Sequence, residues 1–310
     1  DATSGPLGQG IAQAVGMAMA ERAVKAQYPQ GKAVCDHYTY VLCGDGCLQE
    51  GISQEAISLA GHHKLNKLIL FYDSNAITLD GGLGLSFSEN VKMRFKASEW
   101  NVLEVSDGND VDAIDAAINK AKTSKSKPTL IIVHTVIGYG SEKQGTCKVH
   151  GSPLGEEDGA KAKAFYGYDY PAFTIPQEVY DHFKNTFGKR GEEAYKAYNK
   201  NFKAWAEAHK GAAKKLDNAL NEDLSSYFKK EPVFASDNAD SSRVASGKAL
   251  NENYNKIPFL MGGSADVAGS VMTKITDGVN FEPKTPKGRN VNWGIREFAM
   301  AAAQNGMLLH

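Results

Sequence analysis

Four short, mainly apolar segments of strand length constrain most strongly how this chain can fold. They lie at residues 38–43, 68–72, 102–105 and 130–133. Residues 68–72 form a continuous apolar run, which is typical of a parallel strand that is buried on both faces. The first two runs end directly in polar or glycine-rich sequence, so each carries polar residues at its carboxyl end.

Helical segments lie before and between these runs. Apolar residues recur at helical spacing over residues 10–27, and helices are also indicated at 53–62 and 111–122. Strands that alternate with helices form a parallel sheet whose two faces the helices cover. The sequence therefore predicts an α/β fold with parallel sheets covered by helices.

The length and a change in composition predict two domains, because 310 residues exceed one ordinary domain. From about residue 156 to 230 the pattern is largely helical, and we interpret its charges as a solvated face. Beyond it we expect a helix at 244–253 and a strand at 259–261. We place the domains at residues 1–218, including a helical linker region from about 156, and at 219–310.

The charge balance and the apolar runs exclude two classes of partner. The chain has 35 basic and 36 acidic residues, whereas a nucleic-acid binder carries a basic surface. No apolar run approaches the roughly 20 residues that span a bilayer. We therefore expect no nucleic acid and no membrane as partners.

The four cysteines are interpreted as free thiols. So few cysteines in a long chain do not make a disulfide framework. Cys43 and Cys47 flank Gly44-Asp45-Gly46 without an evident second pair of zinc ligands. Buried free thiols in a cytoplasmic protein are the better interpretation.

Polar side chains follow the first two predicted strands. Asp45 lies between two glycines, and Asn75 follows ~30 residues later in Asp73-Ser74-Asn75. Ligands bind beyond the carboxyl ends of strands in open α/β sheets, so we expect both residues at one site. Their oxygen atoms suit Mg²⁺, and the glycines let phosphate approach the backbone. The alternative is a strand-ending turn in which Asn75 caps the next element.

These residues resemble the diphosphate-binding motif of thiamine-dependent enzymes, and four further segments resemble transketolases. Those segments are SGPLGQG at 4–10, HGSPLG at 150–155, GGSAD at 262–266 and GIREFAM at 294–300. The resemblance covers the whole chain. It implies a thiamine diphosphate-binding fold, with most of the diphosphate-binding domain and a truncated pyrimidine-binding domain.

The resemblance implies where the cofactor diphosphate and its metal bind. Asp45, Asn75 and the backbone carbonyl of Ile77 would hold Mg²⁺ against thiamine diphosphate, and Ca²⁺ or Mn²⁺ can substitute for it. Gly44 and Gly46 would border the diphosphate.

Further residues carry over to the cofactor rings. Gly5 and Leu7 would lie at the aminopyrimidine, and Asp266 near the thiazolium. Glu297 would hydrogen-bond the pyrimidine ring nitrogen, which favours the imino tautomer that accepts the C2 proton. We expect the Glu297 carboxyl to be partly desolvated, because it must exist protonated near neutral pH. The alternative is a first-turn helix glutamate that the helix dipole favours.

Substrate contacts and a link between active sites also carry over. His150 would serve in catalysis and in cofactor and substrate binding, or else is a structural loop histidine. Arg243 and Ser270 match residues that bind the substrate phosphate, and arginine suits a phosphate fork. Glu50 and Glu55 match acids that link the two active sites of the family dimer; they could equally be surface carboxylates.

The resemblance implies a transferase with a defined reaction. A transketolase moves a two-carbon ketol group from xylulose 5-phosphate to ribose 5-phosphate or erythrose 4-phosphate, in the pentose phosphate pathway. We expect a cytoplasmic homodimer with the cofactor at the subunit interface.

Two alternatives stay open for the function. One is a related thiamine enzyme such as dihydroxyacetone synthase, and the other is an inactive fragment that only binds or assembles. Ala268-Gly269 and Phe298 depart from the common family residues. In the transketolases that the chain resembles, further histidines upstream contact substrate and cofactor, and an aromatic pocket holds the pyrimidine. Residues 1–310 contain neither, so we expect the 310-residue chain alone to lack activity.

Overall fold

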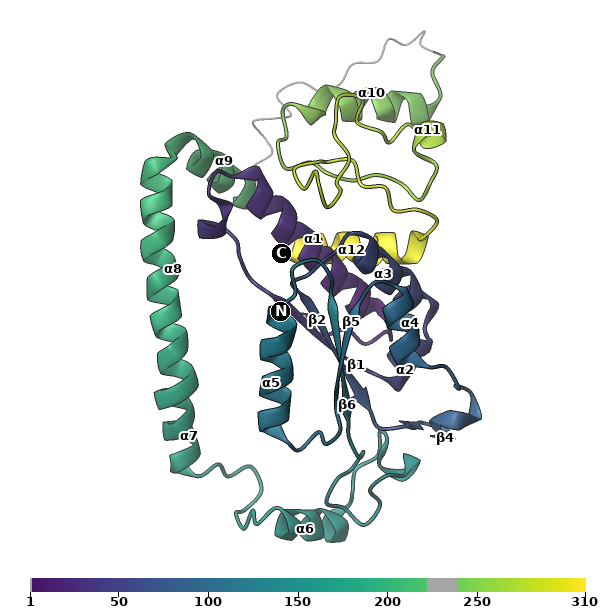
Figure 1. The fold of residues 1–310 in the computed structure, drawn as a ribbon, viewed down its shortest axis with the longest axis vertical. Coiled ribbons are helices and arrows are strands. Elements are labelled where there is room, and N and C mark those ends of the chain that lie inside the picture. Colours follow the sequence, from purple (N-terminus) through teal and green to yellow (C-terminus); the bar gives the residue numbers. More distant parts are fainter. Residues whose placement is uncertain (1, 222–238) are drawn as a thin grey trace.

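A four-stranded parallel sheet forms the centre of the structure, which is a computed structural model that describes residues 2–221 and 239–310 (Figure 1). Its strand order is β1 (Thr39–Gly44), β2 (Leu68–Ser74), β6 (Thr129–His134) and β5 (Asn101–Val105). All three strand pairings are parallel. The predicted α/β architecture is therefore confirmed.

The pairing register brings the carboxyl ends of three strands to one edge of the sheet. Gly44 of β1 pairs with Asp73 of β2, and Ser74 of β2 pairs with His134 of β6. The residues that directly follow β1 and β2 therefore emerge side by side.

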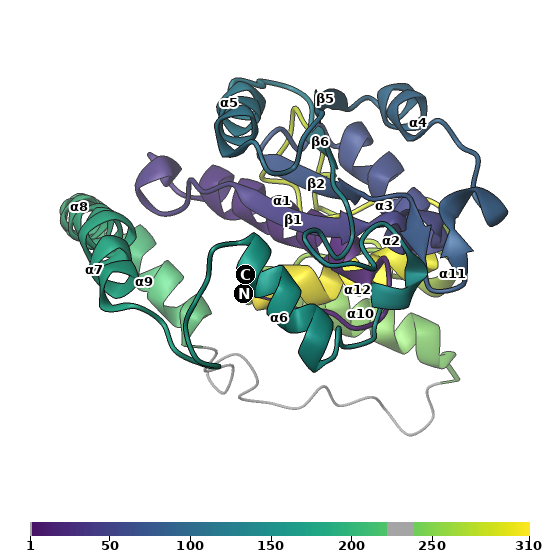
Figure 2. The ribbon, with the colours of Figure 1, turned by 90° about the horizontal axis from the view of Figure 1, so that it is seen from below.

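Helices cover both faces of the sheet (Figure 2). On one face α1 (Gln9–Gln27), α3 (Gly51–His62) and α12 (Glu297–Leu309) bury residues such as Leu70 of β2. On the other face α5 (Val111–Lys122) packs against alternate strand residues. The strand period of two explains this division, because successive side chains point to opposite faces.

The two helices α1 and α12 cross at very short range through glycine. A Cβ atom built on Gly16 of α1 would lie 1.8 Å from the carbonyl oxygen of Ala303 in α12. A Cβ on Gly306 of α12 would lie 1.9 Å from the carbonyl oxygen of Gln13. Only glycine permits this approach, so these positions fix how closely α12 docks on α1.

A helical arm stands beside the sheet domain. Its members are α6 (Glu156–Phe165), α7 (Gln177–Phe183), the π-helix η4 (Lys184–Gly188), α8 (Lys189–Ala208) and α9 (Lys210–Leu220). Trp205 anchors the arm: its side chain is 3% exposed and its Nε1–H donates to the Pro29 carbonyl over 2.7 Å.

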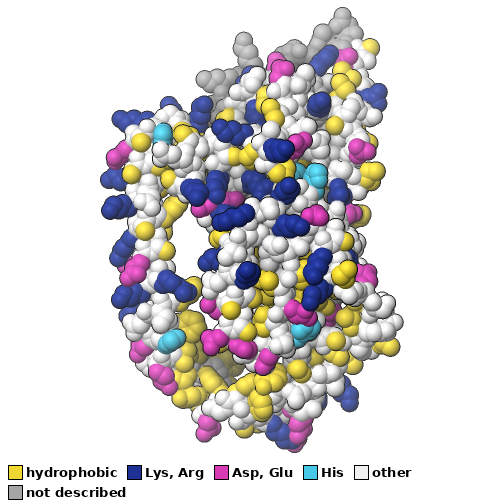
Figure 3. Space-filling model, viewed as in Figure 1, with side chains coloured by type: hydrophobic (Ala, Val, Ile, Leu, Met, Phe, Trp, Pro, Cys, Tyr) yellow, Lys and Arg dark blue, Asp and Glu magenta, His cyan; other side chains and the backbone are white. Residues whose placement is uncertain are grey.

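Figure 3 shows basic and acidic side chains mixed along this arm. Lys196 pairs with Glu192 one helical turn away, and both side chains are exposed. The predicted helical character is confirmed over the described residues of this stretch, and so is the solvated charged face, with Asp158 of α6 as a buried exception. The prediction for 222–230 lies outside the described residues.

The region after residue 239 is mostly irregular apart from its helices α10 (Ser242–Tyr254), α11 (Ala268–Val271) and α12. The predicted helix at 244–253 is confirmed within α10. The strand predicted at 259–261 is wrong, because Phe259 lies in a turn and the next two residues are irregular; the isolated parallel bridge to Asn290 is made by Gly262, after them.

Side chains replace a strand ladder in this region, which is the physical reason for the error. The Arg289 guanidinium donates to the carbonyls of Ile257 and Tyr254 and stacks on the Tyr254 ring, 3.5 Å from its centroid. The Asn290 amide bonds both backbone groups of Ile275. Backbone groups that side chains satisfy do not need a neighbouring strand.

Smaller elements complete the described fold. They are α2 (Asp45–Gln49), α4 (Val91–Ala97), the hairpin β3 (Ile77–Thr78) with β4 (Gly81–Gly82), and the 3₁₀ helices η1 (Gly31–Ala33), η2 (Leu83–Leu85) and η3 (Cys147–Val149). All four cysteines are free thiols, as predicted; Cys35 and Cys43 are buried, whereas Cys47 and Cys147 are half-buried. Within the described residues, no helix is both long and apolar enough to cross a membrane.

Candidate functional site

Asp45 is held in place directly after β1, where it begins the short helix α2. Its side chain is buried, with the residue 3% exposed. The hydroxyl of Tyr72 in β2 donates to one carboxylate oxygen. The backbone N–H of Ala76 donates to the other over 3.1 Å. Asp45 is therefore tied to the end of the neighbouring strand.

The loop after β2 brings Asn75 to the same place. The Asn75 side-chain oxygen accepts the backbone N–H of Ile77 over 3.0 Å, which closes an Asx turn. Ala76 between them is left-handed, with φ +61°. The structure thus brings the Asn75 loop to Asp45, as predicted from the two strand ends, and Ile77 follows in the same turn.

Burial dominates the electrostatics of this group. Desolvation raises the pKa of Asp45, and hydrogen bonds from Tyr72 and Ala76 oppose that rise only in part. The pKa of Tyr72 is raised as well, by burial and then by the Asp45 carboxylate. A carboxylate in such surroundings gains most from a cation, which restores the charged form.

Open space lies beside the glycines of the strand-end motif. No atom lies within 4 Å of a Cβ built on Gly44 or on Gly5, and Gly46 is approached only by Leu7 Cδ1, at 3.0 Å. Gly8, left-handed with φ +80°, packs against the start of α3, and the preceding Leu7 reaches Gly46 in α2. The donor set and this space fit a metal-bound diphosphate.

Glu297 is the first residue of α12, the helix that packs on α1. Its side chain is exposed in this chain, so the expected partial desolvation is not met here. The physical reason is that Glu297 and Phe298 lie on the solvent-facing side of the first turn of α12, whereas Ala299 on its other side is buried. Two residues on, the Ala299 N–H donates to Glu55 Oε2 over 2.9 Å, and Arg296 donates to Ser58 Oγ over 3.0 Å.

The two acids predicted as a relay differ in their surroundings. Glu55 is half-buried and holds the first turn of α12, whereas Glu50 is exposed at the start of α3. The structure therefore brings Glu55, but not Glu50, to the helix turn that carries Glu297.

The remaining predicted residues lie on exposed loops and helix starts. His150 follows η3, and Asp266 is left-handed with φ +64° in the loop before α11. Arg243 lies in the first turn of α10, and Ser270 lies in α11. All four are exposed, and within the described parts of the chain no hydrogen bond joins them to Asp45.

Sequence reasoning missed two hydroxyl groups at this edge of the sheet. Tyr72 bonds Asp45, and the Thr135 hydroxyl donates to Asp73, next to Asn75 in the loop after β2. The alternation within β2 does show that Tyr72 and Leu70 share a face. It does not show that a hydroxyl would reach across to β1.

Comparison with known proteins identifies the class and then the family. The family model described as "Transketolase, thiamine diphosphate binding domain" matches residues 1–225, so the fold and strand-end loops are those of a thiamine diphosphate-binding domain. The model for "Transketolase, pyrimidine binding domain" matches residues 240–310. The chain belongs to the transketolase family.

Curated relatives agree with this assignment. Transketolase from Bacillus subtilis is 49% identical over 314 residues, and that from Geobacillus stearothermophilus is 48% identical over 314 residues. Each alignment covers 100% of this chain and 47% of the relative. The chain therefore spans about half the length of these relatives.

Solved structures share the fold. Transketolase from Leishmania mexicana has a TM-score of 0.93 at 42% identity, over 98% of this chain and 46% of that one. The enzyme from Campylobacter jejuni has a TM-score of 0.83 at 43% identity, with the same coverages. A Pichia stipitis transketolase, solved as a complex with sedoheptulose 7-phosphate, has a TM-score of 0.93 at 38% identity, over the same shares.

Proposed function

We propose that the full-length protein is a transketolase. It transfers a two-carbon ketol group from a ketose phosphate, such as xylulose 5-phosphate, to an aldose phosphate, such as ribose 5-phosphate or erythrose 4-phosphate. One observation carries this proposal: the same transketolase-family chain has both a strand-end oxygen site and a glutamate held at a helix start. The buried Asp45 meets the Asn75 loop at the strand ends, and Glu297 begins a helix that Glu55 holds.

The strand-end residues would hold the cofactor and its metal. Asp45, Asn75 and the Ile77 carbonyl offer hard oxygen ligands, which suit Mg²⁺. The space beside Gly44 and Gly46 accommodates diphosphate oxygens. Thiamine diphosphate supplies the carbanion chemistry when bound, and the protein supplies binding, orientation and proton handling.

Glu297 would handle the proton at the pyrimidine ring nitrogen. Its exposure in a single chain is consistent with a homodimer in which a second subunit covers this carboxyl. Gly5 and Leu7 would border the ring, and Asp266 would lie near the thiazolium. Glu55 would position Glu297 by fixing the backbone of Ala299.

The exposed residues would meet the substrate. Arg243 lies in α10 and Ser270 in α11, and both would bind the substrate phosphate. His150 would donate to the substrate oxygen beside the diphosphate. Glu50 would complete the acidic link between subunits.

The proposal also includes the domain boundary, the metabolic pathway and the cellular location. The domains would divide near residue 218, with the first at 1–218 and the second at 219–310. The protein would act in the pentose phosphate pathway in the cytoplasm, where its free thiols stay reduced.

A second candidate, dihydroxyacetone synthase, differs in its acceptor. Arg243 would bind the phosphate of the xylulose 5-phosphate donor in either enzyme, so only the choice of acceptor distinguishes the two candidates.

A coupled assay of the full-length protein tests the proposal. Xylulose 5-phosphate and ribose 5-phosphate are supplied with thiamine diphosphate and Mg²⁺, and formaldehyde replaces the acceptor in a parallel reaction. We expect turnover with ribose 5-phosphate, its loss in Glu297→Gln, and normal turnover in the exposed control Glu282→Gln. Turnover with formaldehyde alone, or full activity of Glu297→Gln, would contradict the proposal.

A further inference from the structure

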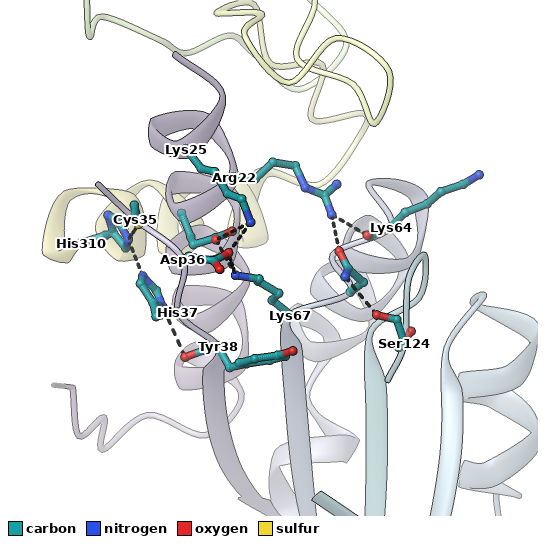
Figure 4. Close-up of polar contacts among 12 residues, drawn as sticks. Arg22, Lys25, Cys35, Asp36, His37, Tyr38, Lys64, Lys67, Ser124 and His310 are labelled. Carbon is teal, nitrogen blue, oxygen red and sulfur yellow. Dashed lines mark hydrogen bonds and ion pairs between the residues drawn. The ribbon is translucent and has the colours of Figure 1, made fainter. Parts of the chain in front are cut away.

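Three metal-ligand side chains meet on the side of the molecule where β1 begins and α12 ends. They are Cys35 and His37, which precede β1, and His310, which follows α12 (Figure 4). We name these three residues the thiol–imidazole cluster. None of them belongs to the strand-end site of Asp45.

The distances within the cluster suit a tetrahedral ion. Cys35 Sγ lies 3.6 Å from His310 Nε2, and the Nε2 atoms of His37 and His310 are 2.7 Å apart. Bonds of ~2.3 Å to sulfur and ~2.05 Å to nitrogen at a tetrahedral zinc separate S and N by ~3.6 Å and two N by ~3.3 Å. All three ligand atoms lie within 4.8 Å of one another. Metal binding would replace the hydrogen bond between the two imidazoles and needs a shift of the exposed His37 ring.

The hydrogen bonds of His37 favour the ligating tautomer. Its Nδ1 lies 3.3 Å from the Tyr38 carbonyl oxygen. A carbonyl oxygen can only accept a hydrogen bond, so Nδ1 carries the proton in this contact. With the proton on Nδ1, the Nε2 lone pair is free for a metal, as in the second shell of most histidine metal sites.

The charges around the cluster balance one another. Asp36 pairs with both Lys25 and Lys67, and Lys67 also bonds Glu21 over 3.0 Å. Two ammonium groups and two carboxylates thus leave no net charge to repel a cation. Asp36 is already paired with two lysines, so we do not count it among the metal ligands.

The cluster holds three protein ligands, whereas a tetrahedral ion takes four. Cys35, His37 and His310 lie along one hollow with Ser4, Gln13 and residues of β1. A site with three protein ligands leaves the fourth position for water or an exchangeable ligand.

We infer that the thiol–imidazole cluster binds a divalent transition metal of the zinc class through Cys35 Sγ and the Nε2 atoms of His37 and His310, with one exchangeable position. Thiolate and imidazole select such ions over Mg²⁺, which prefers oxygen. The thiol proton is released to solvent when the metal–sulfur bond forms. The ion would join β1 of the first domain to α12 of the second.

Cobalt substitution tests the inference on the longest natural chain that contains these residues. The chelator-treated protein is titrated with Co²⁺ and followed by absorption. We expect tetrahedral d–d bands together with a thiolate-to-cobalt charge-transfer band at one equivalent. The oxygen ligands around Asp45 cannot give the charge-transfer band, so the two sites are distinguished.

Matched variants decide which residues bind the metal. Cys35→Ser should abolish the charge-transfer band, and His37→Gln should weaken Co²⁺ binding at least about tenfold. The controls Cys147→Ser and His182→Gln should bind as the wild type does. One equivalent of Zn²⁺ should also displace Co²⁺ from the wild type and remove the charge-transfer band, a readout that does not depend on variant folding. Absence of the band in wild type, its persistence in Cys35→Ser, or an unchanged band after Zn²⁺ is added would overturn the inference.

Discussion

Replacement of Gly16 by alanine should separate the two helices that carry the domain contact. The added Cβ would lie 1.8 Å from the Ala303 carbonyl oxygen and 2.9 Å from its Cα. A carbon–oxygen contact normally needs more than about 3 Å. The obstacle is backbone, so α12 itself must move by more than an ångström.

The size of the effect follows from two opposing terms. Overpacking a well-packed site costs about 1–3 kcal/mol, and a backbone obstacle places Gly16→Ala at the upper end. Alanine gains up to about 1 kcal/mol over glycine within a helix. Gly191→Ala in α8 keeps only the gain, because no atom lies within 4 Å of its added Cβ. The difference between the two variants isolates the steric term, at about 2–3 kcal/mol.

Urea unfolding of both variants, followed by circular dichroism, measures this difference. We expect Gly16→Ala to unfold at lower urea than wild type, and Gly191→Ala to unfold at the same or higher urea. The slope of each transition should stay unchanged, so that midpoints report stability. Equal midpoints for the two variants would refute the argument that glycine is needed where α1 meets α12.

Three further perturbations have outcomes fixed by single contacts. Tyr72→Phe removes a hydrogen bond to Asp45 and should weaken Mg²⁺-dependent cofactor binding about tenfold by calorimetry; unchanged affinity would exclude a positioning role. Burial lowers the pKa of His63 to about 4 from 6.5, so the unfolded chain binds the extra proton. The free energy of unfolding should therefore fall by up to about 3 kcal/mol as the pH drops from 6.5 to 4. His63→Gln should reduce this pH dependence, measured from urea midpoints; the same pH dependence in variant and wild type would refute the role of His63. Glu55→Gln keeps an acceptor for the Ala299 N–H and should change stability by less than about 0.5 kcal/mol, whereas Glu55→Ala should lose about 1–2 kcal/mol; equal losses would contradict the contact.

The sheet and the strand-end loops could be predicted from the sequence because their signals are local. A buried parallel strand needs a continuous apolar run, and 68–72 supplies one within β2. Parallel strands end at a common edge, so the positions of Asp45 and Asn75 after two strands already place them together. The family was indicated by short motifs that resemble those of transketolases; hydrophobic periodicity alone does not indicate a family.

Contacts between distant segments could not be predicted in this way. His310 meets Cys35 across most of the chain, and Tyr72 reaches Asp45 from another strand. The apolar run at 259–261 imitates a strand, but side chains such as Arg289 satisfy the backbone there instead. Such outcomes depend on tertiary packing, which single-sequence patterns do not encode.

Calorimetric titration of thiamine diphosphate into the full-length protein tests the proposed cofactor site most directly. With Mg²⁺ present we expect wild type and the exposed control Asp112→Asn to bind alike. Omission of Mg²⁺, or Asp45→Asn with Mg²⁺ present, should weaken binding at least about tenfold, because the buried carboxylate would hold the bridging metal. Equal affinity of Asp45→Asn and wild type in Mg²⁺ would contradict a metal-bridged diphosphate at the ends of β1 and β2.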